Sequence, residues 1–286
     1  MTQADFSARS ALFVPAANAR ALAKSTQLPA DTLIFDLEDS AAPTEKAAAR
    51  ENLRQHLAAP RSTARHVVRI NSLTTPEGTE DLLMARGARV DAILLPKVEK
   101  AGELAELSQA LEQTDAPPEL AIWAMVETPK GILNAGALAA MQLAYRLEAL
   151  VVGPNDIVAA TNLRPSAGRA ELVPWLAQIV LAAKAAEILV LDGVYNDFRD
   201  RAGFEAECTQ GRAMGFDGKT LIHPDQIEPA NLAFGPTADE LAQAQEIVAA
   251  FADPANAGRG VIRLGGRMVE LLHLKKAQRL LRQKSL

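Results

Sequence analysis

The sequence has very little cysteine, with one residue, Cys208, in 286. A single cysteine excludes an internal disulfide and a cysteine-based metal cluster, and it is typical of proteins of the reducing cytosol. The sequence also lacks an apolar run close to the roughly 18 residues that span a bilayer. Its first ten residues, MTQADFSARS, contain no apolar signal core. We therefore expect a soluble, cytoplasmic protein with no membrane partner.

Positive charge is not in excess. The chain carries 30 Lys and Arg residues against 35 Asp and Glu residues, a formal net charge of −5 at pH 7. Such a chain has no global basic field, so nucleic acid and other polyanions are not expected partners. Hydrophobic residues make up 49% of the sequence, which is enough to build a sizeable core.

A dinucleotide-binding G-x-G-x-x-G motif is also missing after the first apolar run. Eight short apolar runs are present instead. Most of them are apolar without alternation, as in parallel strands that are buried on both faces. These predicted strands cover residues 11–15, 32–39, 66–71, 91–98, 122–128, 149–156, 188–194 and 219–224.

Segments rich in alanine and leucine separate these runs and have helical periodicity. Eight strand–helix units in about 225 residues predict an α/β protein with a (β/α)8 TIM barrel over residues 9–235. A doubly wound open sheet is the alternative. The predicted helices cover residues 18–27, 44–58, 76–87, 100–113, 129–142, 171–186 and 204–215.

Residues 236–286 do not continue this pattern and predict a C-terminal helical extension. Residues 237–251 predict a helix, and residues 253–267 are rich in turn formers and predict a linker or lid. Residues 268–284 predict a last helix, which covers the barrel or reaches a neighbouring subunit. Its cations suit a helix C-terminus at least as well as a phosphate site. They are Lys275, Lys276, Arg279, Arg282 and Lys284.

Polar side chains follow nearly every predicted strand. In a parallel barrel the catalytic groups gather where strands end and loops begin. A solvated strand end explains any one of these residues as well as a site does, but charged residues at the end of nearly every strand favour a site. They are Asp36, Glu38, Asp39, Arg69, Asn71, Lys97, Glu127, Asn155, Asp156, Asp192 and His223.

Two of these carboxylates, Glu127 and Asp156, follow consecutive predicted strands. Neighbouring strands lie about 4.8 Å apart, and two carboxylates at that separation repel unless a cation or proton lies between them. Oxygen ligands without His or Cys favour Mg²⁺. Glu38 and Asp39 are candidates for holding metal-bound water, and Arg69 for clamping a substrate carboxylate. These residues predict a site for a small oxo or hydroxy acid chelated to Mg²⁺.

Eight stretches of the sequence resemble the HpcH/HpaI aldolase and citrate lyase family. Within it, the resemblance is to free-standing CoA-ester lyases similar to the citrate lyase β subunit, and it runs from about residue 9 to residue 283. The stretches are LFVPA, FDLEDSAAPTEKAAAR, VRIN, LLPKVE, ETPKGI, GPNDI, DGVYNDFRD and GFDGKTLIHPDQI.

The resemblance implies a (β/α)8 barrel in a homotrimer or hexamer, with a C-terminal segment that reaches the neighbouring active site. It implies that Glu127 and Asp156 bind Mg²⁺, that Arg69 binds the substrate carboxylate, and that Glu38 and Asp39 support metal-bound water. The implied reaction cleaves or forms a C–C bond in malyl-, citramalyl- or citryl-CoA, and its products are a 2-oxo acid and an acyl-CoA.

The sequence departs from the family pattern near its C-terminus. The family has an aspartate after Arg-Met-Val/Ile that is thought to act as a base in the neighbouring subunit. Here Glu270 keeps the carboxylate and adds a methylene, and Gly265 replaces a frequent acidic residue.

Three basic residues match family positions near CoA: Lys24, Lys46 and Arg50. A solvated helix face explains them equally well. Two other activities stay open. One is a malyl-CoA-type thioesterase, and the other is a citrate lyase β subunit that depends on an acyl carrier protein.

Overall fold

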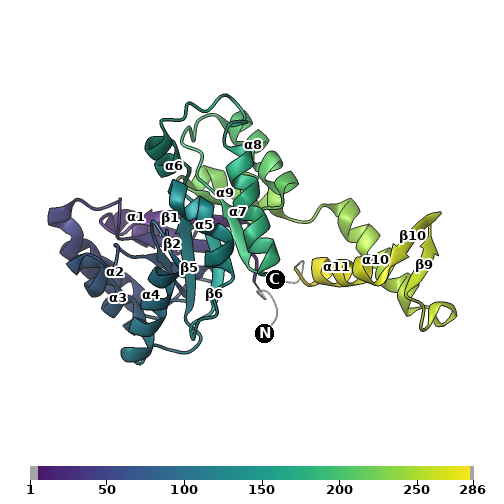
Figure 1. Ribbon diagram of the computed structural model, residues 1–286, viewed down its shortest axis with the longest axis horizontal. Coiled ribbons are helices and arrows are strands. Elements are labelled where there is room, and N and C mark those ends of the chain that lie inside the picture. The colour runs from purple at the N-terminus through teal and green to yellow at the C-terminus, as the bar shows by residue number, and fades with distance from the viewer. Residues whose placement is uncertain (1–5, 284–286) are drawn as a thin grey trace. The chain divides into compact units, whose positions relative to one another are not determined.

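The computed structural model describes residues 6–283. Their main-chain contacts divide into two compact units, residues 8–234 and the segment that begins at residue 235. Figure 1 shows the elements of both units in chain order. None of the described helices is long and apolar enough to cross a membrane.

The first unit is a closed barrel of eight parallel strands, joined in the order β1 to β8. The barrel closes where β1 pairs with β8, with Leu12 opposite Leu221. This confirms the predicted (β/α)8 barrel and excludes the open sheet. The strands are β1 Ser10–Pro15, β2 Thr32–Asp36, β3 Arg65–Arg69, β4 Ala92–Leu95, β5 Ala121–Val126, β6 Leu147–Val152, β7 Leu189–Asp192 and β8 Gly218–Leu221.

Helices follow the strands and cover the outside of the barrel (Figure 1). Several begin with the predicted signal: Thr128 Oγ1 accepts a hydrogen bond from Gly131 N–H at 3.0 Å, and Pro129 takes the first helical position. The helices are α1 Ala19–Ser25, α2 Lys46–Ala58, α3 Pro76–Gly87, α4 Ala101–Gln113, α5 Pro129–Ala139, α6 Pro154–Thr161, α7 Val173–Ala185, α8 Arg201–Met214 and α9 Ile227–Phe234, with short 3₁₀ turns at Pro43–Glu45 and Pro224–Gln226.

Both sides of the barrel strands are buried, which is why their sequences do not alternate. In β5, Ile122, Ala124 and Val126 belong to the core under the helices. Between them, Trp123 is fully buried and its indole N–H donates to Glu148 Oε2 at 2.8 Å.

Seven of the eight strands end earlier than predicted, and this changes where several candidate residues lie. Strand β6 stops at Val152 because Gly153 and Pro154 start helix α6. Asn155 and Asp156 therefore lie in the first turn of a helix, and the prediction that placed them on a strand is wrong. Likewise β2 ends at Asp36, β4 at Leu95 and β5 at Val126. Glu38, Lys97 and Glu127 therefore lie in the loops that follow.

The second unit contains α10 Ala238–Ala252, a 3₁₀ turn Pro254–Asn256, β9 Val261–Leu264, β10 Arg267–Glu270 and α11 Leu271–Gln283. The predicted linker at 253–267 is wrong in part, because β9 and β10 form an antiparallel hairpin. Gly265 and Gly266 have φ values of 56° and 79°, the left-handed backbone of a two-residue hairpin turn. The last helix begins at Leu271 instead of 268. Lys284 and the side chain of Arg282 lie outside the described part of the chain.

A largely buried ionic network joins β7, β8 and α8. Asp192 accepts hydrogen bonds from Arg169 Nη1 and Nη2, both at 2.7 Å, and from Lys219 Nζ at 3.1 Å. Glu207 also contacts Lys219 Nζ at 2.7 Å. Burial alone would raise the pKa of Asp192, but the charges of Lys219 and Arg169 outweigh it and hold that pKa below its usual value.

We predict that Asp192→Ala lowers the free energy of unfolding by about 3–5 kcal/mol, because it leaves buried Arg169 and Lys219 without their main anion. Urea unfolding measures the loss. The matched control is Glu205→Ala, which removes an exposed helical ion pair with Arg201 on α8 and should change stability far less. Equal losses in the two variants would contradict the prediction.

Candidate active site

One cavity of about 350 Å³ is lined by five of the predicted polar residues: Asp36, Asp39, Arg69, Asn155 and Asp156. It lies at the carboxyl ends of the strands, where catalytic groups of such barrels are found. Its lining combines acidic and basic groups with an apolar wall. The sequence analysis did not predict that Met125, Gly153 and Phe13 belong to the site. The lining residues are Phe13, Pro15, Asp36, Asp39, Ser40, Arg69, Met125, Val152, Gly153, Pro154, Asn155, Asp156, Val194 and Ile222.

Arg69 is fixed by a neighbouring strand end. Asp36 and Arg69 are paired in register on β2 and β3. Arg69 Nε and Nη2 donate to the two Asp36 carboxylate oxygens at 2.7 and 2.8 Å. Its Nη1 lies 3.1 Å from Glu38 Oε2 and 3.2 Å from Asp39 Oδ2. Burial would lower the pKa of Arg69, but the Asp36 carboxylate outweighs it and raises that pKa, so the guanidinium stays charged.

The loop after β2 is held from several sides. Asp36 accepts hydrogen bonds from Glu38 N–H at 2.9 Å and from Ser40 N–H at 3.0 Å. Lys46 Nζ donates to Leu37 O, Glu38 O and Asn71 Oδ1. All three donors of this ammonium are used within the protein. Lys46 therefore holds the acidic loop, and its contact with CoA stays a prediction.

Glu127 is fully buried directly after β5. Its Oε1 accepts a hydrogen bond from Lys97 N–H at 2.8 Å. Its Oε2 accepts none from the described residues. Burial, together with the negative charges of Glu38 and Asp156, raises the pKa of Glu127 to about 8. Gly153 gives this side chain its room, since a Cβ there would lie 2.3 Å from Oε2.

Asp156 lies near Glu127 although the two belong to different elements. Val126 and Val152 are paired in register, so the residues that follow β5 and β6 meet at the same edge. Lys97 Nζ lies 4.0 Å from Asp156 Oδ1 and makes a 2.5 Å ion pair with Glu38 Oε1. Burial raises the pKa of Glu38 despite the opposing charges of Arg69 and Lys97.

This arrangement suits a hard divalent cation. Its carboxylates outnumber the two cations Arg69 and Lys97, and one buried oxygen of Glu127 has no donor among the described residues. Among the described residues, no group of three or more His, Cys, Asp or Glu side chains is placed to hold a metal. Mg²⁺ typically needs only one or two protein carboxylates, and its other positions go to water or ligand.

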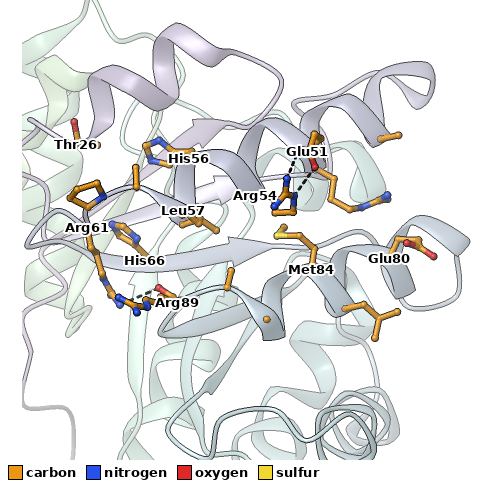
Figure 2. Close-up of a pocket in the computed structure, with 18 residues that line it drawn as sticks. Thr26, Glu51, Arg54, His56, Leu57, Arg61, His66, Glu80, Met84 and Arg89 are labelled. Atoms are coloured by element: carbon orange, nitrogen blue, oxygen red, sulfur yellow. Dashed lines mark hydrogen bonds and ion pairs between the residues drawn. The ribbon is translucent and has the colours of Figure 1, made fainter.

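A larger cavity, of about 1040 Å³, lies elsewhere, between α2 and α3 (Figure 2). Its charged side chains are largely paired: Arg54 with Glu51, and Arg61 with Asp91. Arg50 also lines it, and its Nε donates to Asp81 at 2.8 Å. None of the acids that follow the strands lines this cavity, so chemistry identifies the site better than size does. Arg50 is thus not brought to the site.

Three other predicted residues have different outcomes. Lys24 is exposed in the last turn of α1, where its contact with CoA stays a prediction. His223 stacks on Phe198 and accepts a hydrogen bond from Asp225 N–H through Nδ1, which is a structural role. Glu270 ends β10 in the second unit, where its backbone N–H donates to His273 Nδ1 at 2.9 Å. Its role as a base stays a prediction.

The sequence and the fold have well-characterised relatives. Residues 9–224 match the HpcH/HpaI aldolase/citrate lyase family. A (3S)-malyl-CoA thioesterase of Cereibacter sphaeroides is 42% identical over 274 residues, which cover 96% of this chain and 93% of the relative. The citrate lyase β subunit of Escherichia coli is 34% identical, and the match covers 92% of this chain and 88% of that subunit.

A solved structure is similar over nearly the whole chain. It is the CitE protein of Mycobacterium tuberculosis in complex with magnesium, acetoacetate and coenzyme A. Its sequence is 32% identical and its TM-score is 0.76. The match covers 99% of this chain and 100% of the CitE chain.

We predict that Glu127 makes the metal-free protein less stable as pH rises. Between its usual pKa near 4.5 and its raised pKa of about 8, the folded protein holds a proton that the unfolded chain has released. The free energy of unfolding therefore falls through this window, by about 1–4 kcal/mol for this residue. Urea unfolding in EDTA at pH 5.5 and 8.5 should show a smaller fall in Glu127→Gln than in the unchanged protein.

The matched control for this experiment is Glu106→Gln, which removes an exposed carboxylate on α4. It should leave the fall in stability unchanged. If Glu127→Gln behaved like Glu106→Gln, the buried carboxylate would not hold the proton.

Proposed function

Because the chain belongs to the HpcH/HpaI aldolase/citrate lyase family, we propose that it is a magnesium-dependent lyase of 3-hydroxyacyl-CoA thioesters. Its substrates are malyl-CoA, citramalyl-CoA or citryl-CoA, and its products are a 2-oxo acid and an acyl-CoA. One observation carries this proposal: Arg69 and Asp156 line one cavity at the carboxyl end of the barrel, and buried Glu127 lies against the lining residue Gly153. These groups suit the hydroxy-acid half of such a thioester.

The residues present fit a magnesium ion. Glu127 and Asp156 would hold it, with Glu38 and Asp39 as partners for its bound water. When bound, Mg²⁺ supplies positive charge beside the hydroxyl and carboxylate oxygens of the acid. The unpaired Glu127 Oε2 in the described structure supports this assignment.

The chain's own residues supply binding and proton transfer. Arg69, aligned by Asp36, binds the carboxylate of the acid half. A base takes the proton of the 3-hydroxyl, the C2–C3 bond breaks, and its electron pair passes to the thioester as an enolate. A proton added at C2 then gives the acyl-CoA, and the former carbinol carbon becomes the carbonyl of the 2-oxo acid. We propose Glu270 of a neighbouring subunit of a homotrimer or hexamer as the base.

Thioester hydrolysis is the second candidate function. It is favoured by the 42% identity to a (3S)-malyl-CoA thioesterase over 96% of this chain. The same site would bind the acid half while a base activates water at the thioester carbonyl. A carrier-dependent lyase is supported by the similarity to citrate lyase β subunits. This identity is lower, 34% for the subunit of Escherichia coli.

The deciding experiment incubates the purified protein and Mg²⁺ with malyl-, citramalyl- and citryl-CoA. Released 2-oxo acid and free CoA thiol are measured separately. Oxo acid without thiol, and without any carrier protein, supports the lyase. Thiol without oxo acid overturns it in favour of hydrolysis. Loss of either activity in Asp156→Asn would tie it to this site.

We predict that Gly153→Ala weakens Mg²⁺ binding at least about tenfold, because the new methyl group collides with Glu127 and turns it from the site. A Cβ at Gly153 would lie 2.5 Å from Glu127 Cβ and 2.3 Å from its Oε2. Isothermal titration calorimetry measures the affinity.

The matched control is Gly136→Ala on α5, where an added Cβ meets nothing within 4 Å. It should bind Mg²⁺ like the unchanged protein. Unchanged affinity in Gly153→Ala would show that Glu127 does not hold the ion.

A further inference from the structure

Lys97 has an unusual backbone conformation for its position. Its φ is 52°, in the left-handed region that a residue with a side chain rarely adopts. Asp115, Asn162 and Glu187 share this conformation, but each lies one or two residues beyond the end of a helix, where it is common. Lys97 instead follows strand β4 and Pro96, at the mouth of the barrel. Strain of this kind at a site suggests a role there.

The conformation lets one residue contact several of the site's acids. Its backbone N–H donates to Glu127 Oε1 at 2.8 Å. Its side chain turns to the other acids, with Nζ 2.5 Å from Glu38 Oε1 and 4.0 Å from Asp156 Oδ1. Backbone and side chain thus serve different carboxylates, and an extended residue at 97 would not offer both contacts.

The ammonium of Lys97 has the charge that this acidic cluster needs. Arg69 already pairs with Asp36 through Nε and Nη2, whereas the Lys97 ammonium lies 4.0 Å from Asp156 Oδ1. Its side chain is 42% exposed, which leaves it room to swing toward solvent. The Lys97 ammonium and a divalent cation bound at this site would repel each other, because like charges a few ångströms apart repel.

We propose that Lys97 is a positioning residue that acts as a counterion of the metal site. Its N–H holds Glu127 in place, and its ammonium neutralises Glu38 and Asp156 until a divalent cation displaces it. This inference rests on the proposed function, in which Glu127 and Asp156 hold Mg²⁺. Lys97 therefore weakens the affinity for the ion while it keeps the empty cluster assembled.

The test is Mg²⁺ binding by isothermal titration calorimetry on the full chain at low ionic strength. Lys97→Met keeps the backbone N–H and the aliphatic stem and removes the charge. We expect it to bind Mg²⁺ about five- to fiftyfold more tightly, with the gain reduced at high salt. Lys97→Gly also keeps the N–H, suits the left-handed backbone, and should show the same gain. Unchanged or weaker binding in both variants overturns the inference.

Two further proteins separate the possible failures. Lys100→Met removes the same charge from an exposed position at the start of α4 and should leave the affinity unchanged. Glu127→Gln should lose saturable binding. If the unchanged protein showed no binding that depends on Glu127, the proposed metal site itself would fail. If that dependence held and Lys97→Met did not tighten binding, only the role of Lys97 would fail.

Discussion

The site depends on a carboxylate that is buried without enough positive charge around it. Glu127 is fully buried, and one of its oxygens has no donor among the described residues. A protein tolerates such a group only when its surroundings fix it, or when a proton or cation joins it. Gly153 leaves space beside its free oxygen, and Lys97 binds the other one. The barrel therefore fixes Glu127 in place, and a proton or a bound cation is needed to neutralise it.

The rest of the site is arranged by polar contacts that face away from that carboxylate. Asp36 aligns Arg69 and also shapes the loop that carries Glu38. Lys46 and Asn71 hold the same loop from outside the cavity. These residues use their charges and amides to position the site. A preformed site of this kind binds its substrate with little rearrangement.

Much of the architecture could be predicted from the sequence because it follows from periodicity. Apolar runs such as IWAMV give buried parallel strands, and Thr128-Pro129 gives a helix start. The clustering of Arg69, Glu127 and Asp156 then follows from barrel topology alone. Helix α6 was not predicted because only Gly153 separates its first residue, Pro154, from strand β6, so one pattern was read through the turn. The hairpin of β9 and β10 was not predicted because charged residues interrupt its strands, VIRL and RMVE, so that neither forms an apolar run.

Side-chain partners could not be predicted in the same way, because they depend on distances that the sequence does not contain. Lys46 and Arg50 stand on one helix face as basic residues suited to phosphates. Their actual partners, Asn71 and Asp81, lie 25 and 31 residues further along the chain. Lys97 was visible as a polar residue after a strand. Its left-handed backbone was not, since nothing in Leu-Pro-Lys-Val requires it.

The acids in the first unit also bear on which reaction the protein performs. Asp36 is used by Arg69, and Glu38 lies between Arg69 and Lys97, so neither is free to accept a substrate proton. The raised pKa of Glu127 follows from burial first and then from the charges of Glu38 and Asp156, and it belongs to the metal-free state. The base for either reaction is then a different group, and we propose Glu270, which the family pattern favours. Its extra methylene lengthens its reach. If the carboxylate reaches the 3-hydroxyl, it favours C–C cleavage, and if it reaches a water beside the thioester, it favours hydrolysis.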